Sequence, residues 1–125
     1  GLGDVYKRQI VPSGEAALNQ LGLSTQVPAV WCYISDGPYR SYSWDRTKLE
    51  FRHRTNREIS GMSEKSALVV QALKAIGKEN ITPEILQKIR KKLTPEETRK
   101  LLEETKGCAE WVYKAIRQIG RGEER

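Results

Sequence analysis

The sequence predicts an α+β domain in which a short N-terminal helix leads into a small, mainly antiparallel sheet of three to four strands, covered by three to four C-terminal helices. Three observations support this fold class. Residues 29–34 are continuously apolar, as in a buried strand, and residues 39–54 alternate with period two. From residue 63 onward, apolar residues recur at helical spacing between helix-capping residues. The 125 residues suit one domain.

The first predicted helix begins after Ser13, whose side chain is expected to accept from backbone N–H groups one turn on. Glu15 then lies near the positive end of the helix dipole, and Gly22 ends the helix. The apolar positions in between are Ala16, Ala17, Leu18 and Leu21. The apolar strand of residues 29–34 follows, and the Ser-Asp-Gly-Pro sequence of residues 35–38 predicts a turn at its end.

A hairpin is predicted next, with Asp45 and Arg46 at its turn. Leu49, Phe51 and His53 alternate with polar residues, namely Lys48, Glu50, Arg52 and Arg54. Such alternation is typical of a sheet with one packed face and one solvated face. We therefore expect Leu49 and Phe51 on the inner face under the helices, and the basic residues on the outer face. Residues 55–61 are expected to be a polar connection.

The C-terminal half predicts helices from their capping residues. Ser63 precedes a helix that Gly77 closes, and Thr82 followed by Pro83 opens the next one. Thr94, Pro95, Glu96 and Glu97 form a capping box with proline inside it. Gly107 is expected to break the last apolar stripe near Thr105.

Composition excludes several classes of protein. No stretch approaches the roughly 20 apolar residues of a membrane-spanning helix. The two cysteines, Cys32 and Cys108, are too far apart to indicate a zinc motif or a dense disulfide scaffold. We therefore expect free thiols in a reducing, cytoplasmic environment, with no cofactor.

The sequence also lacks the patterns of common enzymes. It has no phosphate-binding glycine loop and no nucleophile-elbow serine, so we expect no enzymatic activity. His53 is the sole histidine and is expected to be a packed, hydrogen-bonded side chain. A catalytic cleft would have to gather Asp36, Glu50 and His53, whereas a zinc site would have to bring His53 together with Cys32 and Cys108.

The net charge is +6 and is unevenly distributed. Between Arg40 and Arg57 six cations face two anions, Asp45 and Glu50, which leaves 6 − 2 = +4. A surface of this kind attracts polyanions. The candidate nucleic-acid-binding residues are Arg46, Lys48, Arg52, Arg54 and Arg57, and the alternative is an ordinary solvated sheet face.

The aromatic residues allow two interpretations, whereas a second basic cluster is assigned to its own helix. Four aromatic residues could form a stacking platform for single-stranded nucleic acid, although packing within the sheet is the interpretation we favour. They are Tyr33, Tyr39, Tyr42 and Trp44. The helical cations are interpreted as stabilising the C-terminal end of their own helix. They are Lys88, Arg90, Lys91 and Lys92.

Four blocks of sequence resemble a known family. They are SGEAALNQLGLSTQVP at residues 13–28, SDGPYR at 35–40, FRHRTNREISGMS at 51–63 and LVVQALKAIGK at 68–78. These blocks resemble the C-terminal domain of bacterial AbiEi-like antitoxins, in the branch catalogued as a domain of unknown function. The resemblance implies an antitoxin and transcriptional regulator of a type IV toxin–antitoxin system in phage defence. Its antagonist would be a nucleotidyltransferase-like toxin, counteracted without a stable complex.

In that family a winged-helix N-terminal domain binds the operator DNA. The chain resembles only the C-terminal part, so no residue here can be assigned to a recognition helix. Residues 1–9 resemble a translated sequencing adapter and are expected to be non-native, residues 10–119 to be the domain, and residues 120–125 to be a disordered tail. The alternatives are a nucleic-acid-binding accessory domain and a protein-interaction module that uses the helical half.

Overall fold

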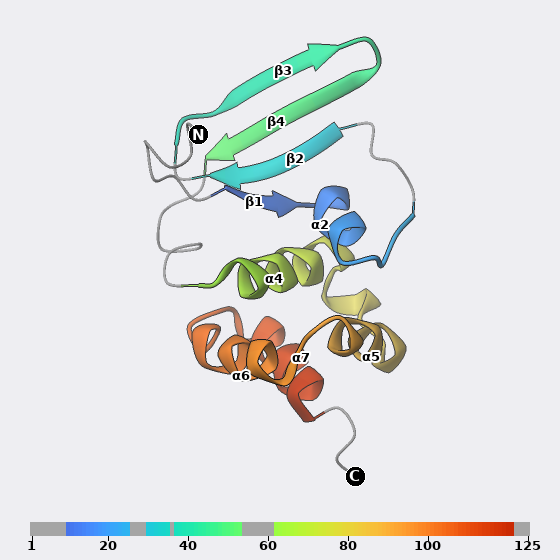
Figure 1. Cartoon of the computed structure of the whole chain (residues 1–125), viewed down its shortest axis with the longest axis vertical. Coiled ribbons are helices and arrows are strands. Elements are labelled where there is room, and N and C mark those ends of the chain that lie inside the picture. Colours follow the sequence, from blue (N-terminus) through green and yellow to red (C-terminus); the bar gives the residue numbers. More distant parts are fainter. Residues whose placement is uncertain (1–9, 26–29, 36, 54–61, 122–125) are drawn as a thin grey trace.

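The computed structural model describes residues 10–25, 30–35, 37–53 and 62–121. Within these residues the chain forms a four-stranded sheet and a group of helices. Figure 1 shows the sheet at one end of the molecule, α4 next to β1, and α5, α6 and α7 on the side of α4 away from the sheet. The predicted α+β fold class is confirmed.

The sheet has the strand order β1-β2-β4-β3. Its strands are β1 (Ile10–Ser13), β2 (Val30–Ser35), β3 (Arg40–Trp44) and β4 (Thr47–His53). β1 pairs with β2, and β3 with β4, in antiparallel fashion, whereas β2 and β4 are parallel. The predicted hairpin turn is confirmed: Asp45 has a φ of 53°, a conformation that aspartate tolerates better than most residues.

The connection from β2 to β3 passes one end of β4, because β4 lies between these two strands in the sheet. β3 lies beyond β4, so the chain leaving β2 crosses the C-terminal end of β4 before it enters β3. The His53 side chain, at that end of β4, donates from Nδ1 to the Gly37 carbonyl oxygen over 2.8 Å. The predicted hydrogen-bonded role of His53 is confirmed, but its side chain is exposed rather than packed.

Three helices, α4, α5 and α6, begin where the capping residues Ser63, Thr82 and Thr94 predict. The helices of the described residues are α2 (Glu15–Gln20), α4 (Glu64–Ile76), the short 3-10 helix η1 (Lys78–Asn80), α5 (Pro83–Lys91), α6 (Pro95–Glu104) and α7 (Glu110–Arg121). The side chains of Ser63 and Thr82 accept from backbone N–H groups three residues on. Thr94 and Glu97 form the reciprocal capping box, which fixes the start of α6.

Two helix ends differ from the prediction. Ser13 is the last residue of β1, where it pairs with Cys32, so Gly14 precedes α2 and no side chain caps it. α7 continues to Arg121, past the predicted domain end at residue 119. Arg90 stabilises this end, because its Nη1 donates to the carbonyls of Ile119 over 2.8 Å and Gly120 over 3.1 Å. Arg90 therefore caps a neighbouring helix rather than its own.

Two hydrophobic clusters meet at α4. The larger lies among the helices and includes Leu73, Ile89, Leu101 and Ile116, all at most 1% exposed. The smaller joins Val11 of β1 and Ile34 of β2 to Ala67 of α4, with Met62 beside it. α4 contributes to both clusters and therefore connects the sheet to the C-terminal helices.

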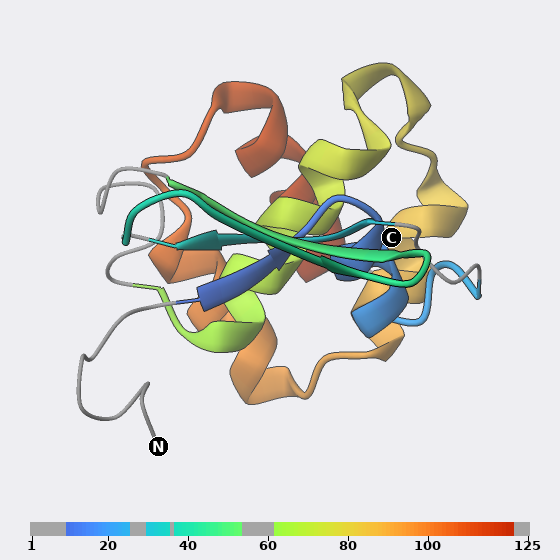
Figure 2. The same ribbon diagram turned by 90° about the horizontal axis from the view of Figure 1, so that it is seen from above.

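The helices meet the sheet along one edge. The principal contacts run from α4 to β1 and from α2 to β1 and β2. Figure 2, seen from above, shows the strands nearly superposed as a narrow band that crosses the helical layer. Of the C-terminal helices expected to cover the sheet, only α4 makes extensive contact with it. β4 and β3 therefore extend away from the helical layer.

Glu104 links α6 to the start of α4. Its Oε1 accepts from the Ser63 backbone N–H over 2.8 Å and from the Ser63 hydroxyl over 3.0 Å. Burial acts to raise the pKa of Glu104, but the hydrogen bonds from the Ser63 amide and the Ser66 and Ser63 hydroxyls outweigh it, so the pKa lies below its ordinary value of 4.5. A carboxylate with a lowered pKa stabilises the fold above that ordinary value, and the contribution is lost as pH falls through the lowered pKa.

We expect Glu104→Ala to lower the free energy of unfolding by about 1–3 kcal/mol at neutral pH, because the Ser63 amide loses its acceptor. Glu104→Gln keeps an acceptor oxygen and should be milder. Urea denaturation at about pH 7 and about pH 3 measures both effects. The difference between the wild type and Glu104→Gln should shrink at the lower pH, and a difference that grows there would contradict this role.

Candidate nucleic-acid interface

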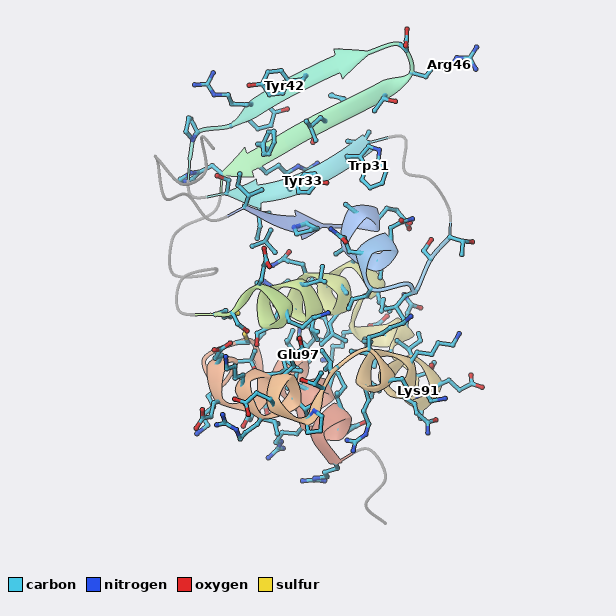
Figure 3. All side chains as sticks on the ribbon, in the orientation of Figure 1. Trp31, Tyr33, Tyr42, Arg46, Lys91 and Glu97 are labelled. Atoms are coloured by element: carbon cyan, nitrogen blue, oxygen red, sulfur yellow. The ribbon has the colours of Figure 1, made fainter. Side chains whose placement is uncertain are left out.

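The β3–β4 hairpin forms the end of the molecule farthest from the C-terminal helices (Figure 1). Arg46 lies at its turn and is exposed, and Figure 3 shows its side chain pointing away from the sheet. Lys48 and Arg52 lie on β4, with 45% and 52% of their side chains exposed. Two other predicted site residues, Arg54 and Arg57, lie outside the described residues.

Glu50 lies between two of the predicted cations and pairs with both. Its Oε2 is 3.2 Å from Lys48 Nζ and its Oε1 is 3.2 Å from Arg52 Nε. The hydrogen bond from Lys48 and then that from Arg52 hold the pKa of Glu50 below its usual range, against the opposing effect of burial. Glu50 is therefore ionised at neutral pH and offsets part of the charge of these two cations.

The remaining positive charge lies at the two ends of β3. From Arg40 to His53 the hairpin carries four cations and two anions, Asp45 and Glu50, which gives 4 − 2 = +2. Among the described residues of this hairpin, Lys48 and Arg52 form ion pairs with Glu50. Arg40 and Arg46 are both exposed and remain available for an anionic ligand.

One face of the sheet carries a group of aromatic and apolar side chains that we call the aromatic face. Tyr33 pairs with Phe51, and Trp31 and Tyr42 both pair with Leu49, so all five side chains lie on one side. None of them belongs to, or contacts, either buried cluster. Figure 3 shows Trp31, Tyr33 and Tyr42 on the side of the sheet turned toward the viewer.

Three rings of the aromatic face form a row across β2, β4 and β3. The centroids of Tyr33 and Phe51 are 5.8 Å apart with 26° between the ring planes, so the two rings are nearly parallel. Tyr42 lies edge-on to Phe51, with centroids 6.3 Å apart and an interplanar angle of 83°. Tyr42 is 48% exposed, whereas Tyr33 and Phe51 are half-buried. The row therefore presents ring surface to solvent.

The polar residues on the aromatic face are neutral or basic. Arg40 pairs with Phe51, and His53 follows Phe51 by two residues, so both lie on this side of the sheet. Among the described strand residues, none of the positions on this side is aspartate or glutamate. The face is consequently suited to a ligand that combines flat apolar groups with negative charge.

The prediction of which face is inside was wrong. Leu49 and Phe51 lie opposite the side that carries Val11 and Ile34, which α4 buries. Lys48, Glu50 and Arg52 share the side of Ile34, because Arg52 pairs with Ile34 across the parallel β2–β4 ladder. The alternation itself is present. The sheet meets the helices along β1, so the distal strands need no apolar inner face.

A comparison with protein families gives one match. The profile of DUF6088 matches residues 4–101, which include all four strands. The chain belongs to the DUF6088 family. DUF6088 is described as a family of unknown function. No curated protein and no solved structure matches the sequence.

Enzymatic or metal chemistry in this DUF6088 chain would need reactive or metal-binding side chains to gather in one place. Glu50 and His53 lie on opposite faces of β4, so they do not form one cleft, and Asp36 lies outside the described residues. Within the described part of the chain, no three His, Cys, Asp or Glu side chains gather in a metal-binding group. In the same part, no helix is long and apolar enough to cross a membrane.

Sequence reasoning did not include Arg40, Phe51 and Trp31 among the candidate binding residues of this DUF6088 domain. A two-residue turn at Asp45 and Arg46 places Arg40 opposite Phe51 and Tyr42 opposite Leu49, so their common side was readable from the hairpin. Of the aromatic residues considered earlier, Tyr39 precedes β3 and is 58% exposed, and the Trp44 side chain is not among those described.

Proposed function

We propose that this chain is a nucleic-acid-binding domain of an AbiEi-like transcriptional regulator, and that it binds through the β3–β4 hairpin. The observation that carries the proposal is the position of this hairpin. It stands clear of the helical layer, has a charge of 4 − 2 = +2, and has no carboxylate among the described strand residues of its aromatic side.

The spacing of the exposed arginines supports binding to a chain of phosphates. Arg40 begins β3 and Arg46 follows its end. A strand rises about 3.4 Å per residue, so the four steps from Arg40 to Trp44 span roughly 14 Å. That length covers several nucleotides. Arginine is well suited to such contacts, because its planar guanidinium donates two parallel hydrogen bonds to a phosphate.

The proposal is tested by reversing charge on the hairpin and, separately, on the helices. Arg40→Glu with Arg46→Glu changes the net charge by the same amount as Lys88→Glu with Lys91→Glu on α5, where both lysines are exposed. Figure 3 shows Lys91 far from Arg46. Fluorescence anisotropy with labelled single-stranded and duplex DNA of about 20 nucleotides measures the affinities.

We expect the hairpin variant to bind about 25-fold more weakly at about 0.1 M salt, because two phosphate contacts are lost, and the α5 variant to bind within about threefold of the wild type. Equal losses in the two variants would show a response to net charge alone. Absence of binding by the wild type to either DNA at low salt would refute the proposal.

The antitoxin role rests on the resemblance of the four sequence blocks to AbiEi-like proteins. It makes the domain a cytoplasmic antagonist of a nucleotidyltransferase-like toxin, while a winged helix elsewhere in the parent protein reads the operator. A toxin gene of that class directly beside the parent gene, and rescue of growth when the two are co-expressed, are the expected results. Growth that is equally good when the toxin is expressed without the parent gene would contradict this role.

A further inference from the structure

The aromatic face has a feature that phosphate binding does not explain, namely its exposed rings. Cations are sufficient to bind phosphate. This side of the sheet also exposes a row of aromatic rings that crosses three strands. An exposed aromatic surface is an unfavourable feature in water unless a ligand covers it. The nearly parallel rings of Tyr33 and Phe51 present flat surfaces in similar directions, and the Tyr42 ring stands edge-on beside them.

We infer that the aromatic face binds single-stranded DNA by stacking unpaired bases on Tyr33 and Phe51, with Tyr42 flanking them and Arg40 beside the phosphates. This inference rests on the proposed nucleic-acid-binding function and names its ligand class. Bases in a duplex are stacked on each other, so their flat surfaces cannot reach the rings. Aromatic side chains on a sheet stack successive bases with little sequence preference, because every base has a π-face.

The charges of the face agree with this ligand. Arg40 and His53 lie on the same side as the rings, and the described strand residues on that side include no carboxylate to repel phosphate. We take DNA as the ligand because the proposed function is that of a transcriptional regulator, and comparison with RNA is one outcome of the test.

The central test uses the wild-type chain with three probes of equal length: oligo-dT, an abasic strand with the same phosphates, and duplex DNA. Each base that stacks contributes about 5- to 150-fold in affinity. We therefore expect oligo-dT to bind at least about tenfold more tightly than the abasic strand and the duplex. Equal affinity for oligo-dT and the abasic strand would overturn the inference and leave phosphate binding by the hairpin intact.

Ring variants supply a second test. Tyr33→Thr keeps a residue that favours strands but removes a stacking ring, and Tyr33→Phe keeps the ring. We expect about fivefold or greater weakening of oligo-dT binding with Tyr33→Thr and wild-type affinity with Tyr33→Phe. Affinity for the abasic strand should be the same in all three proteins, a result that loss of fold would not give. Weakening of both probes by Tyr33→Thr would contradict stacking.

Two other outcomes would also overturn the inference. Oligo-rU bound more tightly than oligo-dT would make RNA the ligand. A dimer in light scattering that Tyr33→Thr converts to a monomer would show that a second copy of the chain covers the aromatic face. Absence of binding to every nucleic acid, including the abasic strand at low salt, would remove the proposed function as well.

Discussion

Replacing Leu73 with alanine is expected to lower the free energy of unfolding by about 2–5 kcal/mol, the range for truncating a fully buried leucine. Leu73 is 0% exposed on α4, in the cluster that joins α2 and α4 to the C-terminal helices. The truncation removes apolar contacts and leaves a cavity that close-packed neighbours fill only in part. Urea denaturation followed by circular dichroism measures the change.

Leu68→Ala provides the matched control, since Leu68 lies on the same helix but is only half-buried at the rim of the cluster. Its effect should be smaller than that of Leu73→Ala. Because α4 contributes to both hydrophobic clusters, the loss of helix and sheet signals should coincide in the Leu73 variant. A destabilisation no larger than that of Leu68→Ala would contradict the central position of α4.

The second large effect concerns the salt dependence of DNA binding. Each contact with a single-stranded phosphate contributes about −0.7 to the slope of log K against log salt. With Arg40 and Arg46 as the contacts, the wild-type slope is about −1.4, and affinity falls about sevenfold between about 50 and about 200 mM salt. Lys48 and Arg52 add little in the wild type, because each is paired with Glu50 over 3.2 Å.

Glu50→Gln removes the ion-pair partner of both cations with little change in the shape of the side chain. Lys48 and Arg52 lie on the face of β4 opposite the aromatic face, so DNA bound on the rings should not reach them, and the slope is expected to stay at about −1.4. Glu103→Gln is the matched control, because Glu103 pairs with Arg99 on α6 and its loss changes the net charge equally. A slope that Glu50→Gln steepens toward about −2.8 would show that Lys48 and Arg52 also contact the DNA, and would contradict binding on the aromatic face.

Local features of the fold were predictable because their causes are local. Ser63, Thr82 and Thr94 cap helices through hydrogen bonds to residues three positions away, so the sequence pattern contains all the information needed. The hairpin turn at Asp45 is likewise a short-range feature. β1 was not predicted, because a strand of four residues shows little periodicity. Its last residue, Ser13, pairs with Cys32 of β2 instead of capping α2.

The orientation of the sheet was not predictable from alternation. Period two separates Phe51 from Arg52 but does not say which of them faces the helices. That choice follows from the parallel pairing of β2 with β4, which places Arg52 beside Ile34, and from the burial of Ile34 against α4. Both are contacts between distant segments. No local pattern indicates that β3 lies at the edge of the sheet, on the side of β4 away from β2.

Within the candidate site, the partial neutralisation of charge was foreseeable and the exposure of the rings was not. Lys48, Glu50 and Arg52 alternate on one strand and therefore share a face, which already predicts the ion pairs. Aromatic residues in strands are usually covered by packing. Tyr33 and Phe51 differ because the helical layer reaches only the β1 side of the sheet.

The most direct test of a nucleic-acid-binding sheet is the mapping of amide chemical shifts by NMR during a titration with oligo-dT at low salt. The largest changes should occur in β2, β3 and β4, around Tyr33, Tyr42 and Phe51, with little change in α5 and α7. Largest changes in α5 and α7, or no change anywhere in the spectrum, would contradict the sheet as the binding surface.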